Sequence, residues 1–91
     1  MILNELYTTI LQRRDHPNPE SYTARLFAAG RAEIAKKVGE EAIEVILAAS
    51  AQTRQRLIEE VADLAYHTLV LMAEADVTPE DVAAELAHRR R

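Results

Sequence analysis

The chain has no cysteine and no tryptophan, only two glycines and three prolines, and an aromatic content of 4%. The absence of cysteine excludes disulfide frameworks, thiolate nucleophiles and cysteine-based zinc sites. No uncharged run approaches the ~20 apolar residues that a membrane-spanning helix needs, and the N-terminal segment with Asn4 and Glu5 differs from a secretion signal. We therefore expect a cytoplasmic protein with no membrane partner.

Basic charge is also scarce. The chain carries 11 Lys and Arg against 15 Asp and Glu, which gives a net charge of −4. A broad basic surface for duplex nucleic acid is therefore absent. The basic run at residues 89–91 is typical of a solvated helix end that complements the helix dipole. Nucleic acid is not an expected partner.

What the chain does contain favours helices. Hydrophobic residues make up 48% of the 91 positions, and Ala, Leu, Glu, Arg and Val are among the commonest types. These residues prefer helices to strands, apart from valine. A chain of this length buries too little surface to form two cores, so we expect a single domain over residues 1–91.

Apolar periodicity and capping residues predict about five helices. The first runs from about residue 2 to residue 14 and ends before the Pro17 and Pro19 loop. The second follows a Ser21 cap and ends near Gly30, which suits the left-handed position after a helix. Two long helices follow, from residue 31 to about 50 and from a Thr53 cap to about 74. A Thr78 cap starts the last helix.

The two long helices are apolar on more than one side. Ile43 and Leu47 lie opposite the main apolar face of the third predicted helix, and Tyr66 and Val70 do so on the fourth. A monomer would leave these residues uncovered. We therefore expect an all-α helix bundle that a second copy of the chain completes, most simply as a homodimer.

Acidic residues with helical spacing form the most informative pattern. Glu41 and Glu44 lie three apart on the third predicted helix, and Glu60 and Asp63 lie three apart on the fourth. Residues three apart share one helix face, and an antiparallel pairing would turn the two faces toward each other. Such a cluster needs a cation, and oxygen ligands suit Mg²⁺ or Mn²⁺.

An ordinary explanation competes with this metal site. Acids on exposed helices are common, and three basic residues stand at the right spacing to pair with them: Lys36 with Glu40, Lys37 with Glu41, and Arg56 with Glu60. The same residues have a functional interpretation. Lys37, with Lys36 or Arg14 as weaker choices, is placed to bind phosphate oxygens. His67 lies one turn after Asp63, either as a phosphate contact or as a hydrogen-bonded boundary residue.

Several segments together resemble the phosphoribosyl-ATP pyrophosphohydrolase family, a branch of the all-α NTP pyrophosphatase superfamily that also contains MazG-type enzymes. The superfamily pattern Glu-x-x-Glu followed by Glu-x-x-Asp is matched by the two acidic pairs. The narrower family adds three segments, which here read Ser21-Tyr22-Thr23, Lys37-Val38-Gly39-Glu40-Glu41 and Asp63-Leu64-Ala65-Tyr66-His67. The resemblance covers most of the chain.

The resemblance implies Mg²⁺-dependent hydrolysis of phosphoribosyl-ATP to phosphoribosyl-AMP and pyrophosphate, the second step of histidine biosynthesis. It implies metal ligation by Glu41, Glu44, Glu60 and Asp63, with Glu40 as a proton acceptor or an outer-shell water ligand. Two polar residues of these segments and three basic residues would bind the substrate: Thr23, His67, Lys37, Lys36 and Arg14. Two alternatives stay open, a MazG-like house-cleaning (d)NTP pyrophosphatase and a non-catalytic helical dimerisation module.

Overall fold

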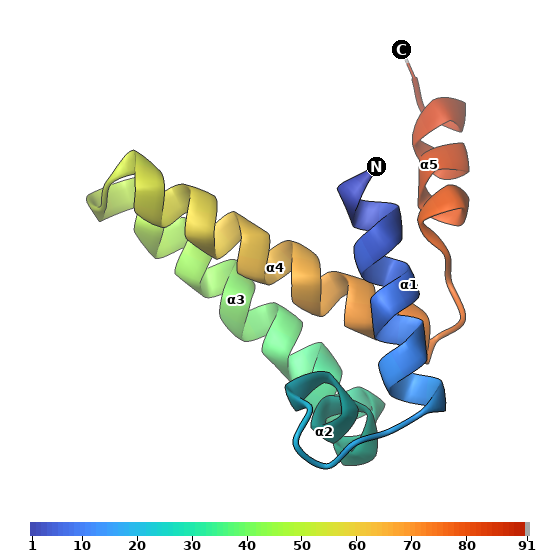
Figure 1. The fold of residues 1–91 in the computed structure, drawn as a ribbon. Coiled ribbons are helices and arrows are strands. Elements are labelled where there is room, and N and C mark those ends of the chain that lie inside the picture. The colour runs from blue at the N-terminus through green and yellow to red at the C-terminus, as the bar shows by residue number, and fades with distance from the viewer. Residues whose placement is uncertain (91) are drawn as a thin grey trace.

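The computed structural model describes residues 1–90, and Arg91 at the end of the basic run lies outside the described residues. Five helices follow one another along the chain, and residues 1–90 contain no strand (Figure 1). This confirms the predicted fold class and the predicted number of helices. The helices are α1 (Ile2–Asp15), α2 (Tyr22–Ala29), α3 (Arg31–Ala51), α4 (Arg54–Glu74) and α5 (Pro79–His88).

The helix boundaries follow from the local signals in the sequence. The hydroxyls of Ser21, Thr53 and Thr78 each accept a hydrogen bond from the backbone N–H three residues later, which caps α2, α4 and α5. Between α2 and α3 the backbone of Gly30 has a φ of 96°. A side chain would strain this conformation, so glycine lets the chain turn sharply between the two helices.

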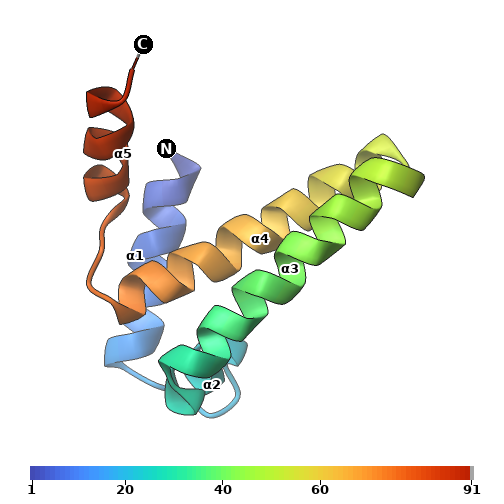
Figure 2. The same cartoon turned by 180° about the vertical axis from the view of Figure 1, so that it is seen from behind.

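The long helices α3 and α4 form an antiparallel hairpin, and the other helices gather at its open end (Figures 1 and 2). There α1 packs across the C-terminal part of α4, α2 lies beside the start of α3, and α5 stands next to α1. The core lies where these elements meet. Its largest fully buried side chains are Ile10 of α1, Ile34 of α3 and Val70 of α4.

The prediction that Tyr66 and Val70 lie on an uncovered side of α4 was wrong. Val70 is completely buried among residues of α1 and α3, and Tyr66 is half-buried with its ring stacked on Tyr22 of α2. The short helices thus cover a side of α4 that helical periodicity alone left open. The prediction for α3 is confirmed, because Ile43 and Leu47 remain 58% and 48% exposed.

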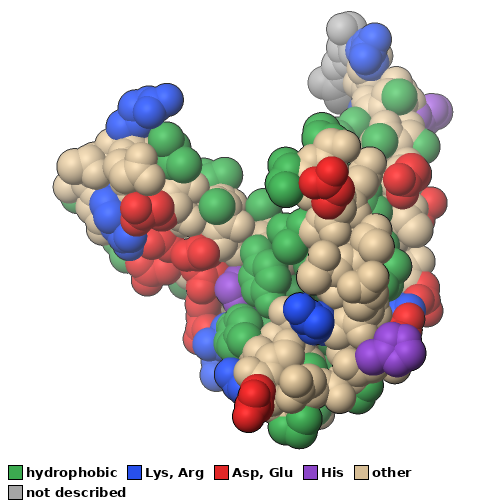
Figure 3. All heavy atoms as spheres, viewed as in Figure 1, with side chains coloured by type: hydrophobic (Ala, Val, Ile, Leu, Met, Phe, Trp, Pro, Cys, Tyr) green, Lys and Arg blue, Asp and Glu red, His purple; other side chains and the backbone are tan. Residues whose placement is uncertain are grey.

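Apolar surface therefore remains along the hairpin. Besides Ile43 and Leu47, the exposed side chains include Ile46, Ile58 and Val61. Figure 3 shows hydrophobic side chains along the notch between the hairpin and α1, while acidic side chains gather on the lower side of the hairpin. Within residues 1–90, none of the helices combines the length and the apolar character needed to cross a membrane.

Candidate functional site

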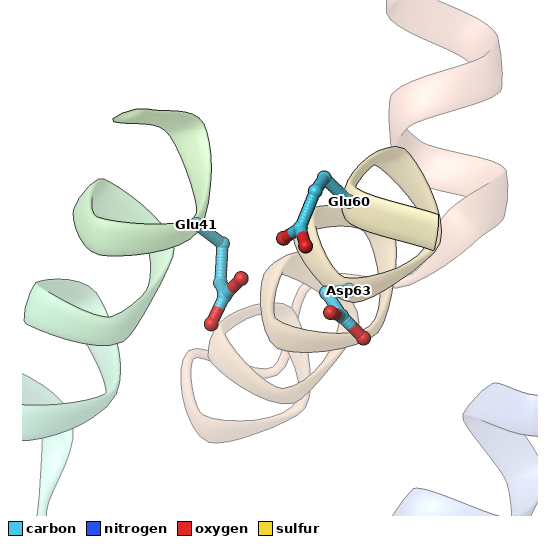
Figure 4. Close-up of side chains that lie close together, drawn as sticks. All are labelled: Glu41, Glu60 and Asp63. Atoms are coloured by element: carbon cyan, nitrogen blue, oxygen red, sulfur yellow. The ribbon is translucent and has the colours of Figure 1, made fainter. Parts of the chain in front are cut away.

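Three of the predicted acidic residues converge in the hairpin. Glu41 of α3 and Glu60 and Asp63 of α4 each offer a carboxylate oxygen, and these oxygens lie within 4.8 Å of one another. Glu41 and Glu60 point toward each other across the space between the helices, and Asp63 lies nearby on α4 (Figure 4). We call these three residues the carboxylate cluster. Antiparallel pairing of α3 and α4 brings it together, as expected from the spacing.

The charges of the carboxylate cluster repel one another. At 4.8 Å two carboxylates repel by about 3.5 kcal/mol at an effective dielectric of ~20, and by about 1 kcal/mol in water. Glu60 is buried, at 6% exposure, whereas Asp63 is exposed. Three oxygen donors from two packed helices match the ligand preference of Mg²⁺ or Mn²⁺, and a divalent cation would offset the repulsion.

Arg56 balances part of this charge. Its guanidinium forms ion pairs with Glu60 and Glu59 on the same helix. The hydrogen bond to Glu59 and the negative charge of Glu60 raise the pKa of Arg56. The predicted pairing of Arg56 with Glu60 is confirmed.

The other two predicted acids lie outside the carboxylate cluster. Glu44 is exposed on α3, three residues beyond Glu41, and does not belong to the group of converging oxygens. Glu40 is exposed and its Oε1 lies 3.6 Å from Lys37 Nζ. We expected Lys37 to pair with Glu41, but its ion pair is with Glu40. The neighbouring Lys36 is exposed on α3.

His67 connects the carboxylate cluster to α2. Its imidazole is buried, with Nδ1 2.8 Å from the backbone carbonyl oxygen of Asp63 and Nε2 3.0 Å from the Tyr22 hydroxyl. A carbonyl only accepts, so Nδ1–H donates to Asp63, and in the neutral ring Nε2 then accepts from the Tyr22 hydroxyl. This chain of hydrogen bonds holds α2 against the turn of α4 that carries Asp63.

A second contact between α2 and α4 lies beside the first. The hydroxyls of Thr23 and Tyr66 hydrogen-bond to each other, and the rings of Tyr22 and Tyr66 stack with centroids 6.3 Å apart. Burial raises the pKa of Tyr66, while the hydrogen bond to Thr23 acts in the opposite direction. Thr23 and His67, both predicted to bind substrate, thus lie in one group next to the carboxylate cluster.

Residue-by-residue reasoning did not assign roles to Tyr22 and Tyr66. The signal was present nevertheless, because both tyrosines stand inside the segments that carry the family resemblance. Each is the immediate neighbour of a predicted site residue, Tyr22 of Thr23 and Tyr66 of His67.

Arg14 of α1 contacts the C-terminal end of α4 rather than the carboxylate cluster. Its Nη1 donates to the carbonyl oxygen of Ala73 in the last turn of α4 at 2.9 Å, and to Asp76 Oδ1 just after the helix at 3.1 Å. Its hydrogen bond to Asp15 raises the pKa of Arg14. Ala73 follows Asp63 by about 15 Å along the helix. The predicted role of Arg14 in substrate binding stays a prediction, and its observed contacts join α1 to the end of α4.

The chain is similar in sequence to one protein family over nearly its whole length. Residues 3–90 match the family model described as "Phosphoribosyl-ATP pyrophosphohydrolase". The chain is 50% identical over 90 residues to the phosphoribosyl-ATP pyrophosphatase of Saccharolobus solfataricus, covering 99% of this chain and 96% of that protein. It is 49% identical over 90 residues to the protein of that name from Pyrobaculum islandicum, with the same coverage.

A longer protein also matches. The histidine biosynthesis bifunctional protein HisIE of Gloeobacter violaceus is 52% identical over 89 residues, which are 98% of this chain but 40% of that protein. The chain thus spans less than half of the bifunctional relative and nearly the whole length of the two pyrophosphatases.

Proposed function

This chain belongs to the phosphoribosyl-ATP pyrophosphohydrolase family, and we propose that it hydrolyses phosphoribosyl-ATP to phosphoribosyl-AMP and pyrophosphate in the second step of histidine biosynthesis. The observation that carries this proposal is a sequence identity of 49 to 50% to phosphoribosyl-ATP pyrophosphatases over 99% of the chain. The carboxylate cluster supports it with chemistry that a phosphoanhydride hydrolase needs.

We propose that Glu41, Glu60 and Asp63 hold Mg²⁺ or Mn²⁺, with Glu44 as a fourth ligand. Three convergent oxygen donors fit such an ion, and Mg²⁺ commonly takes its remaining ligands from water and substrate phosphates. When bound, the ion supplies charge neutralisation on the polyphosphate and acidification of the attacking water. Glu44 could join through a rotamer change, since its side chain is exposed one turn beyond Glu41.

The surrounding residues have distinct tasks in this proposal. Lys37 and, more weakly, Lys36 bind phosphate oxygens and stabilise the charge that develops on the leaving pyrophosphate. Lys37 lies one turn before Glu41 on α3, and its ammonium forms an ion pair with Glu40. Glu40, exposed next to Glu41, accepts the proton of the attacking water or binds it through a second water.

The hydrogen-bonded residues of α2 and α4 orient the carboxylate of Asp63 in this proposal. The hydrogen bond from His67 to the backbone of Asp63 fixes the turn of α4 that presents the Asp63 carboxylate. Thr23 and His67 also offer polar atoms to the sugar or phosphate of the substrate. Such a contact would compete with their present partners, the hydroxyls of Tyr66 and Tyr22.

We also propose a homodimer and a cytoplasmic location. The exposed apolar side chains of Ile43, Ile46 and Leu47 on α3 and of Ile58 and Val61 on α4 support the dimer, since burying them against a second copy is favourable. The location is proposed because a nucleotide-hydrolysing step of amino-acid biosynthesis, which the names of the relatives indicate, uses phosphorylated substrates that are kept inside the cell.

Comparing substrates tests the proposed function. Purified protein with Mg²⁺ is incubated with phosphoribosyl-ATP and, separately, with each canonical dNTP, and pyrophosphate and the nucleotide product are quantified. We expect kcat/KM for phosphoribosyl-ATP to exceed that for every dNTP, with one pyrophosphate per phosphoribosyl-AMP. Preferred turnover of a dNTP would favour a house-cleaning enzyme. No turnover and no thermal stabilisation by Mg²⁺ would favour the non-catalytic module.

A further inference from the structure

Arg56 makes three contacts near the carboxylate cluster. One guanidinium nitrogen, Nη2, binds the carboxylate of Glu60, and the other, Nη1, binds Glu59. Its Nε donates to Gln52 Oε1 at 3.4 Å. The Arg56 side chain is 48% exposed, whereas that of Glu60 is 8% exposed. A half-exposed guanidinium is therefore the positive partner of the most deeply buried carboxylate of the cluster.

A divalent cation in the carboxylate cluster would change this pairing. It draws on the Glu60 carboxylate, whose Oε1 accepts the hydrogen bond from Arg56 Nη2. The positive charges of the cation and of the guanidinium also repel each other at short range. We therefore expect cation binding to weaken the ion pair between Arg56 and Glu60 and to favour release of the Nη2 group.

The released group would stay close to the cluster. Glu59 still holds Nη1, so the guanidinium can turn about this contact rather than swing into solvent. A guanidinium offers parallel N–H donors whose spacing matches two phosphate oxygens. Along the hairpin Arg56 lies on the turn side of the cluster and Lys37 on the opposite side, so the two basic residues flank it.

We propose that Arg56 is a further substrate-binding residue, which serves as counter-ion of Glu60 without the cation and binds a polyphosphate oxygen once the cation takes Glu60. This inference rests on the proposed function and on the proposed metal ligands. It adds a residue to the phosphate contacts and an exchange of partners that links cation binding to substrate binding.

The experiment compares Arg56→Gln with Arg54→Gln. The control removes the same charge two residues away on another side of α4. Calorimetry measures the affinity of the free protein for Mg²⁺ and of the Mg²⁺-loaded protein for magnesium pyrophosphate, and steady-state rates give KM for phosphoribosyl-ATP. For Arg56→Gln we expect Mg²⁺ to bind about threefold or more tightly, because a competing cation is gone. We expect KM to rise and pyrophosphate affinity to fall by about tenfold or more.

Arg54→Gln should leave all three quantities within about twofold of wild type. An Arg56→Gln protein with unchanged or weaker Mg²⁺ binding, or with unchanged pyrophosphate affinity, would overturn the inference. If Arg56→Gln does not fold, Arg56→Lys replaces it: a lysine keeps the charge but loses the fork, so KM must still rise. Unchanged KM in that variant would equally overturn it.

The outcomes also separate this inference from the proposed function. A wild-type protein that does not release pyrophosphate from phosphoribosyl-ATP contradicts the proposed function. In that case Mg²⁺ and magnesium pyrophosphate binding by the two glutamine variants still decide the role of Arg56.

Discussion

Replacing Asp63 by Asn removes one of three carboxylates whose oxygens lie within 4.8 Å of one another. Each neighbouring pair repels by about 1 kcal/mol in a water-like dielectric. This lower value applies because Asp63 is exposed, and the ion pair of Glu60 with Arg56 weakens one of the two repulsions. The cation-free variant should therefore gain about 1 to 2 kcal/mol, and each kcal/mol raises Tm by about 4 to 8 °C for a domain of this size.

Magnesium should reverse this order of stability, because it stabilises the wild-type protein far more than the variant. At 100 times its Kd, Mg²⁺ stabilises the wild-type protein by about 2.7 kcal/mol, and a hundredfold loss of affinity would reduce this to about 0.4 kcal/mol. Thermal unfolding with EDTA and with Mg²⁺ measures both effects. Asp15→Asn, the same change at the end of α1, is the matched control and should keep the full Mg²⁺ effect. If Asp63→Asn also keeps it, Asp63 is not a ligand and the proposed metal site is wrong.

Four further predictions concern other parts of the molecule. Lys37→Ala should lower kcat/KM by about 1.5 to 3 kcal/mol without weakening Mg²⁺ binding, which initial rates and calorimetry measure; lost Mg²⁺ affinity would argue against a phosphate contact. Glu44→Gln should weaken Mg²⁺ binding less than Glu41→Gln, because only Glu41 lies in the carboxylate cluster, and the reverse order would contradict this ligand set. Ile34→Ala should reduce the free energy of unfolding by about 2 to 5 kcal/mol in urea, since Ile34 is fully buried; a negligible loss would contradict the described core. Light scattering should give about twice the 10.2 kDa chain mass and a lower mass for Ile46→Glu, whereas a wild-type monomer at micromolar concentration would exclude the dimer.

Local signals explain why so much of the fold could be predicted from the sequence. The three hydroxyl caps and Gly30 act within a few residues, and the structure contains each of them. The burial of Val70 could not be predicted in the same way. It depends on α1 packing across α4, a contact between segments about 60 residues apart that helical periodicity does not encode.

In the candidate site, too, local spacing could be predicted, whereas contacts that depend on rotamers or on distant segments could not. Spacing of three along each helix predicted that two acidic pairs would meet, because this needs only the antiparallel hairpin; Glu41, Glu60 and Asp63 do meet, whereas Glu44 stays outside the group. The exact ion pair of Lys37 depends on side-chain rotamers, and the structure selects Glu40, three residues away, over Glu41, four residues away. The hydrogen bond between Tyr22 and His67 joins residues 45 apart, so only the family resemblance pointed to these segments.

The central claim is that the carboxylate cluster holds a divalent cation on which the hydrolysis of phosphoribosyl-ATP depends. Its most direct test is pyrophosphate release from phosphoribosyl-ATP by chelator-dialysed protein as Mg²⁺ is added back. We predict no turnover without the cation and a saturable return of activity, with Mn²⁺ able to replace Mg²⁺. Full turnover in excess chelator would contradict the claim.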